Sequence, residues 1–288
     1  MSSRDVALTR PTAVRRMLAE LAVRPSRALG QNFLVDANIL RILVDAAELS
    51  PSDGVVEVGP GLGALTDALL ARAGRVLAVE KDARLAAHLA DRYAGNARFE
   101  LLPCDALSVD WARRLGGGLN KVVSNLPYAV GSRVLVDLAG APRPPDSMVV
   151  TVQQEVGARL TARPGEKDYG LLTLLVGYRY RGCAVKRVGP RCFWPPPQVH
   201  SSIVRLMRCG GAALSCEEDR LFRELAAVAF RHRRKQLGRV LTRHWRHPRV
   251  AEGRALAALE ALGIAPEARP ETVAVDQWVA LAKGLMHG

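Results

Sequence analysis

The sequence has little cysteine, and what it has is not arranged for metal binding or disulfides. Its 288 residues include five cysteines, an odd number, with no Cys-x-x-Cys pair. This excludes a zinc ribbon and a disulfide scaffold, and it predicts a cytoplasmic protein with reduced thiols and no metal centre. No apolar run approaches the about 18 residues that span a membrane. Residues 1–24 also lack the apolar centre of a secretory signal, so we expect a basic, frayed N-terminal extension and no membrane association.

Lysine is also scarce, although the chain is strongly basic. Only six of its 41 cationic residues are Lys, and against 28 acids they give a net charge of +13. Such an excess favours a partner rich in phosphate or carboxylate. By itself it is weak evidence, because a preference for Arg over Lys can reflect genome composition.

Strands and helices alternate beyond residue 35, which predicts an α/β fold with a parallel sheet and crossover helices. The expected strands are 55–58, 75–79, 99–102, 121–124, 148–152 and 199–207, and the expected helices follow Asp36 and cover 64–73, 85–93 and 132–138. Helical patterns alone follow near 218–231, 233–245, 252–262 and 272–286. We therefore divide the chain into the extension 1–24, an α/β domain over 25–210 and a small helical domain over 211–288.

A glycine-rich loop ends the first of the strands after residue 50. Gly59 and Gly61 lie in a G-x-G-x-G pattern, in which the backbone can pass close to a ligand and the following helix offers free N–H groups. A dinucleotide site has the spacing G-x-G-x-x-G, whereas this tighter loop suits a smaller ligand such as S-adenosylmethionine. Glycines at a strand end are also common in simple turns.

Acidic residues end the next two strands. Glu80 follows Gly59 by 21 residues, where a carboxylate can accept the ribose hydroxyls of an adenosine-containing ligand. Asp105 could accept the adenine amino group, or it could simply cap a helix. Because strand ends of a parallel sheet share one crevice, we favour a common binding site.

Asn125-Leu126-Pro127-Tyr128 ends the fourth strand. The Asn125 side-chain oxygen and the Leu126 carbonyl could accept both N–H groups of an aromatic amine such as adenine N6 and aim its lone pair at a methyl group. Tyr128 could then stack on a base swung out of its helix. A strand ended by proline, with the tyrosine in the core, is the structural alternative.

These motifs, in this order, resemble the ribosomal RNA adenine N6,N6-dimethyltransferases. The resemblance runs from about residue 25 to the C-terminus and is carried by Leu29–Leu34, Glu57–Thr66, Ala78–Asp82, Asp105-Ala106, Asn125–Tyr128 and Phe193–Ser201. It implies a Rossmann-like class I methyltransferase sheet and S-adenosylmethionine as the cofactor. His200 stands where the family usually has Asp.

The resemblance also implies roles for individual residues. The cofactor contacts fall on Asn32, Leu34, Gly59, Gly61, Glu80, Asp105 and Asn125. The catalytic group is Asn125, Leu126, Tyr128 and Phe193, with Phe193 packing on the target base opposite Tyr128. RNA contacts are expected from Arg163, Lys167, Arg231, Arg233, Arg234 and Lys235.

The resemblance implies a substrate as well. The expected activity is dimethylation of two adjacent adenines in the 3′-terminal hairpin of 16S rRNA, by a monomer acting on an immature 30S subunit. The alternatives are a 23S rRNA adenine N6-methyltransferase of the macrolide-resistance type, a nonenzymatic assembly or transcription factor with the same fold and, least favoured, an NAD-dependent dehydrogenase.

The resemblance gives the net charge a location. Residues 205–250 contain 12 Lys or Arg and four acids, and residues 1–28 contain six Arg and two acids. Genome composition would spread the excess more evenly. We therefore expect the N-terminal segment and the helical domain to hold RNA through its phosphates.

Overall fold

The computed structural model describes residues 8–26, 29–210, 214–251 and 253–287. They form two compact units. The sheet unit comprises the residues up to Gly157 together with Arg181–Arg208, and the helical unit comprises Ala158–Tyr180 and the residues from Cys209 onward.

In the described part of the chain, the sheet unit contains a seven-stranded sheet in the order β4-β3-β2-β5-β6-β9-β7. Its strands are β2 (Gly54–Val58), β3 (Arg75–Val79), β4 (Phe99–Leu102), β5 (Leu119–Asn125), β6 (Ser147–Gln153), β7 (Tyr180–Val188) and β9 (Ser201–Arg208). The five neighbouring strands β4, β3, β2, β5 and β6 are parallel, and β9 runs antiparallel to β6. The expected α/β class is confirmed. Strand β7 was not predicted, because most of its side chains are exposed and show no apolar alternation.

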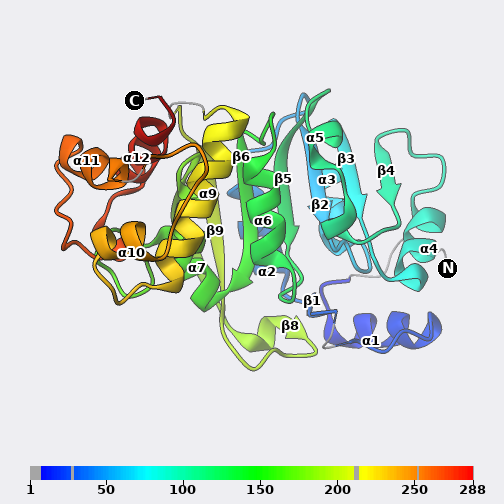
Figure 1. The fold of residues 1–288 in the computed structure, drawn as a ribbon. Helices are drawn as coiled ribbons and strands as arrows, with labels where there is room; N and C mark the ends of the chain where they lie inside the picture. Colours follow the sequence, from blue (N-terminus) through cyan, green and yellow to red (C-terminus); the bar gives the residue numbers. More distant parts are fainter. Residues whose placement is uncertain (1–7, 27–28, 211–213, 252, 288) are drawn as a thin grey trace. The chain divides into compact units, whose positions relative to one another are not determined.

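Helices cover both faces of this sheet. They are α2 (Ala37–Asp45), α3 (Ala64–Leu70), α4 (Ala83–Arg92), α5 (Trp111–Arg114) and α6 (Gly131–Gly140), with the short turn η2 (Ala106–Ser108). Figure 1 shows α6 in front of β5 and β6 and α2 behind the strands. Asp36 caps α2 as expected, since its carboxylate accepts the N–H groups of Asn38 and Ile39. The apolar side of α2 packs with Val123 and Val149 of the sheet.

Residues 11–20 of the N-terminal extension form a helix and are not frayed, while residues 1–7 lie outside the described part of the chain. Helix α1 (Pro11–Glu20) buries Val14, Met17 and Leu18 against Val35, Leu62 and Leu85 of the sheet unit. The expectation of fraying was wrong for these residues, because the apolar side chains recur at helical spacing between the arginines. Helix α1 lies beside β8 (Phe193–Trp194), which pairs with β1 (Phe33–Leu34) and follows the turn η3 (Pro190–Cys192) (Figure 1).

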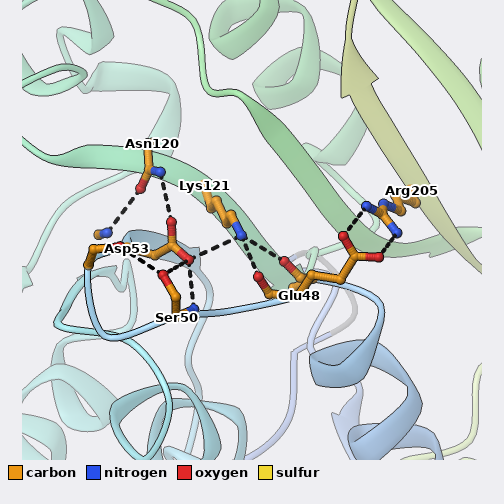
Figure 2. A network of polar contacts seen from close by, with 9 residues as sticks. Glu48, Ser50, Asp53, Asn120, Lys121 and Arg205 are labelled. Carbon is orange, nitrogen blue, oxygen red and sulfur yellow. Dashed lines mark hydrogen bonds and ion pairs between the residues drawn. The ribbon is translucent and has the colours of Figure 1, made fainter.

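A polar network joins the start of β2 to the start of β5 and to β9 (Figure 2). The Asp53 carboxylate accepts from Asn120 Nδ2 at 2.8 Å, from the Ser50 N–H at 2.7 Å and from Lys121 Nζ at 3.1 Å. Lys121 also donates to the Glu48 carbonyl at 2.6 Å, and Arg205 donates two hydrogen bonds to the Glu48 carboxylate. This network fixes the amino ends of the central strands.

The helical unit contains more of the chain than expected. Its elements are α8 (Leu171–Gly177), α9 (Cys216–Arg231), α10 (Leu237–Arg243), α11 (Arg254–Ala261), η4 (Pro270–Thr272) and α12 (Val275–His287), and α7 (Gln154–Thr161) leads into it. Residues 158–180 belong to this unit, whereas we had assigned them to the α/β domain. Tyr169, Leu174 and Tyr178 are buried in the core of the unit, and the Tyr169 hydroxyl donates to the Val273 carbonyl at 2.8 Å.

Candidate functional site

A cavity of about 1090 Å³, its open mouth included, lies at the carboxyl ends of β2, β3, β4 and β5. In open α/β sheets this is the edge at which ligands bind. All of the residues expected to contact a cofactor line it: Asn32, Leu34, Gly59, Gly61, Glu80, Asp105 and Asn125. The structure therefore brings together side chains that are up to 93 residues apart in the sequence.

The glycine loop has a backbone that other residues adopt only with strain. Gly59 and Gly61 have φ values of 71° and 60°, in the left-handed region. A Cβ on Gly59 would lie 2.9 Å from Pro127 Cγ, and one on Gly61 would lie 3.0 Å from Phe33 Cε1. The loop thus keeps its backbone close to the cavity only because both positions are glycine.

Glu80 is held against this loop by the backbone. Its Oε2 accepts the Gly61 N–H at 3.1 Å, and its Oε1 accepts the Asp82 N–H at 2.9 Å. Burial raises the pKa of Glu80, and the two N–H groups partly oppose that rise. Each oxygen has a further lone pair, so the carboxylate can still accept the hydroxyls of a ligand.

Asp105 caps a helical turn, one of the two roles that its position suggested, and its contact with an adenine amino group stays a prediction. Its Oδ1 accepts the Leu107 N–H at 2.9 Å and so caps η2, while its Oδ2 lies 2.7 Å from Lys81 Nζ. Lys81 keeps the pKa of Asp105 below its usual value. The carboxylate is therefore ionised and lies on the cavity wall.

Asn125 presents an acceptor that nothing in the described structure uses. Its Nδ2 donates to the Asn32 carbonyl at 2.9 Å, which fixes the orientation of the amide. Its Oδ1 is buried and has no hydrogen-bond partner among the described residues. Because buried polar atoms are nearly always paired, this oxygen points to a donor supplied by a ligand.

The other expected catalytic residues lie outside the cavity lining. Leu126 is buried, and Tyr128 is half-buried with its hydroxyl hydrogen-bonded to Ser201 Oγ. Phe193 is only 2% exposed and packs in the apolar core with α2 and α3. Phe193 pairs with Leu34 across β8 and β1, but its ring is buried and is not part of the cavity lining, so the structure does not present it to a target base as we had expected.

Two cavity residues were quoted in motifs but given no role from the sequence. Gly30 has φ of 65°, and a Cβ there would lie 2.8 Å from the backbone nitrogen of Tyr128, so this glycine lets the segment before β1 pack on the Asn-Leu-Pro-Tyr loop. Glu57 lies within β2, is 1% exposed, and accepts the Thr66 hydroxyl at 2.7 Å. Burial raises the pKa of Glu57 to about 8. An acid inside a run of valines was the signal that could have identified it.

Comparison with known proteins places this site in a family. The family model for ribosomal RNA adenine dimethylase matches residues 24–286. Ribosomal RNA small subunit methyltransferase A of Moorella thermoacetica is 38% identical over 94% of this chain and 96% of its own length. The protein of the same name from Geobacillus thermodenitrificans is 35% identical over 98% of each chain. The chain belongs to the ribosomal RNA adenine dimethylase family.

Solved structures agree with this family assignment. A dimethyladenosine transferase from Plasmodium falciparum superposes with a TM-score of 0.70 at 24% identity, covering 85% of this chain and 94% of its own, which supports the fold. The 23S rRNA methyltransferase ErmE superposes with a TM-score of 0.65 at 28% identity, covering 88% of this chain and 99% of its own. The protein is thus a class I, S-adenosylmethionine-dependent rRNA adenine dimethyltransferase.

The cavity fits the methyl donor of the family. Its glycine loop leaves room for backbone contact, and Glu80 offers a fixed carboxylate for ribose hydroxyls. The unpaired Asn125 oxygen leaves an acceptor at the end of the same cavity.

No helix within the described residues is both long and apolar enough to cross a bilayer.

Several of the expected RNA contacts of this dimethyltransferase share a surface groove in the helical unit. Lys167, Arg231 and Arg233 line it together with Arg159. Arg233 donates to the Lys167 carbonyl at 2.9 Å, which joins the segment before α8 to the segment after α9. Arg163 and Arg234 lie outside the lining of this groove, and Lys235 Nζ is instead 2.9 Å from His244 Nε2.

Proposed function

We propose that this protein transfers methyl groups from S-adenosylmethionine to N6 of two adjacent adenines in the 3′-terminal hairpin of 16S rRNA. Its substrate would be an immature 30S subunit, on which it acts in the cytoplasm as a monomer. The name shared by its relatives, ribosomal RNA small subunit methyltransferase A, supports the choice of subunit.

The observation that carries this proposal is the unpaired Oδ1 of Asn125. An adenine amino group is a poor nucleophile, because its lone pair is delocalised into the ring. Asn125 Oδ1 and the Leu126 carbonyl accept its two N–H groups, which localises the lone pair and orients it. Hydrogen bonding to the Asn32 carbonyl keeps the Asn125 amide from turning.

The remaining groups position the reactants. When bound, S-adenosylmethionine supplies an electrophilic methyl group on its sulfonium. Glu80 and the glycine loop hold the donor at the strand ends, and the Tyr128 ring, anchored by Ser201, gives a face for the flipped base. The methylated amine loses its proton to solvent, so the chain needs no strong general base. We assign no stacking role to Phe193, because its ring lies in the core.

The groove of the helical unit would hold the RNA through its backbone. Lys167, Arg231 and Arg233 offer donors to phosphates, as Arg163, Arg234 and Lys235 do from neighbouring positions. Contacts of this kind carry no sequence information and weaken as salt rises. They would hold the particle while the sheet unit selects the base.

A second candidate is a 23S rRNA methyltransferase, which the structural similarity to ErmE favours. Incubation with labelled S-adenosylmethionine and undermethylated 30S or 50S subunits separates the two. We expect label in 30S subunits, at N6 of two adjacent adenines, and labelling by the Asn125→Ala variant that is slower on the order of 10² to 10³-fold. Label in 50S subunits alone would establish the second candidate. Label in neither particle would indicate a nonenzymatic factor.

A further inference from the structure

The sheet unit has a basic surface of its own, formed in part by the N-terminal segment whose charge we expected to hold RNA. We call it the α1 groove. It lies between α1 and the start of α4, and its lining includes Arg15, Leu18, Arg24, Asp82, Arg84 and Trp194. Arg15 and Arg24 come from the N-terminal segment and Arg84 comes from α4, so the fold brings together cations from two parts of the chain.

The cations of the α1 groove are available to a ligand. Arg15, Arg24 and Arg84 are exposed, and within the described residues none of them forms an ion pair. Arg15 lies over the Trp194 ring, with Cζ 3.9 Å from the ring centroid, and Arg84 donates to the Ala22 carbonyl. These contacts hold two guanidinium groups in place without neutralising them.

The acidic residue in the groove lining, Asp82, already accepts hydrogen bonds within the protein. Asp82 Oδ1 accepts the N–H groups of Arg84 and Leu85 at 3.0 and 3.2 Å and so caps α4. Its Oδ2 accepts Gln31 Nε2 at 3.2 Å. The groove therefore presents net positive charge over an apolar floor that includes Leu18 and Trp194.

The α1 groove and the cofactor cavity are lined by different residues of the same elements. Val14 lines the cavity, while the next residue, Arg15, lines the groove. Phe33 lines the cavity, and its strand partner Trp194 lines the groove. Neighbouring residues of α1 and paired residues of β1 and β8 therefore line the cavity and the groove, respectively.

We propose that the α1 groove binds phosphates of the substrate RNA close to the methylated bases. The inference rests on the proposed function, and it assigns the RNA contact expected of the N-terminal segment to a defined groove that also includes Arg84 of α4. Phosphodiesters are the anions that such a substrate presents next to a flipped base, and guanidinium groups bind phosphate with paired donors. Helix α1 thus contributes to the cavity with one face and to RNA binding with the other.

The test compares two double variants that lose the same charge. Arg15→Gln with Arg24→Gln alters the groove, while Arg41→Gln with Arg113→Gln removes two exposed arginines of α2 and α5. Binding of each protein to undermethylated 30S subunits and to naked 16S rRNA is measured over a range of salt. S-adenosylmethionine affinity and thermal unfolding are measured alongside.

We expect the groove variant to bind both RNA probes about tenfold more weakly than wild type, with a salt slope smaller by about 1.4 for two lost contacts. The α2/α5 variant keeps wild-type RNA affinity, and both variants keep S-adenosylmethionine affinity and unfolding temperature.

Three results would overturn the inference. The two variants could bind RNA equally well, or the groove variant could lose cofactor affinity or stability to the same extent as it loses RNA affinity. The groove variant could also bind 30S subunits more weakly while its binding to naked rRNA is unchanged, which would indicate a protein partner. If wild-type protein fails to methylate either subunit, the proposed function itself fails. If it methylates 30S subunits and the groove variant binds like wild type, only the groove assignment fails.

Discussion

The two ends of β2 and β5 differ in whether their buried polar groups have hydrogen-bond partners. At the amino ends, Asp53 and Lys121 share a network in which each carboxylate oxygen of Asp53 has a partner (Figure 2). At the carboxyl ends, Asn125 Oδ1 is left without one among the described residues, and Glu57 accepts only the Thr66 hydroxyl. One end of the strands is built to hold the sheet together, and the other keeps acceptors free for ligands.

Asparagines at the two ends of β5 make the comparison testable within one strand. Asn125→Ala removes the acceptor for the adenine amine, so we expect kcat to fall on the order of 10² to 10³-fold. Asn120→Ala removes a partner of Asp53 and should lower stability while kcat per folded molecule stays the same. Single-turnover methylation and urea unfolding of both variants check this. Equal kcat losses in the two variants would remove the functional distinction between the ends.

The ion pair of Lys121 with Asp53 tests whether the network at the amino ends of the strands stabilises the sheet. In the Lys121–Asp53 pair the side chains are 16% and 8% exposed, so Lys121→Met leaves a buried carboxylate without its cation. We expect the free energy of unfolding to fall by about 3–5 kcal/mol. Arg114→Met, which breaks an exposed pair with Glu100, is the control and should cost less than about 1 kcal/mol. A similar cost for both variants would show that the network does not hold the strands.

The last expected effects are in the pH dependence of stability. Burial raises the pKa of Asp53, but hydrogen bonds from Asn120, Ser50 and Lys121 outweigh it and lower that pKa to about 2. Asp53 therefore stabilises the fold above about pH 4 and loses this contribution as pH falls toward 2. Glu57 has its pKa raised to about 8, so its contribution to stability falls as pH rises from about 4.5 to 8.

Two variants separate these effects. Unfolding measured across pH should show that Asp53→Asn loses the acid-side dependence, and that Glu57→Gln loses the dependence between pH 5 and 8. Glu57→Gln should also gain stability relative to wild type at pH 8. A Glu57→Gln variant whose stability still falls toward pH 8 would contradict this assignment.

The sequence predicts the sheet and the cavity well, because both follow from local patterns. Alternation of strands and helices gives β2 to β6, and parallel strands bring Gly59, Glu80 and Asp105 to one edge. The helix α1 was obscured by its arginines, although its apolar spacing was present in the sequence.

Long-range packing accounts for what the sequence left out. The burial of Phe193 depends on the pairing of β8 with β1, which lie about 160 residues apart in the chain. The contact of Asp53 with Lys121 and the place of residues 158–180 in the helical unit likewise arise only in the folded chain. No local propensity indicates such partners.

Amide hydrogen exchange with and without S-adenosylmethionine tests the division between the two ends most directly. We predict that the cofactor increases protection at residues 30–34, 57–63, 80–82 and 105–107 and leaves residues 48–54 and 119–121 unchanged. Protection that concentrates at 48–54 and 119–121, with the carboxyl ends unaffected while the cofactor is bound, would contradict it.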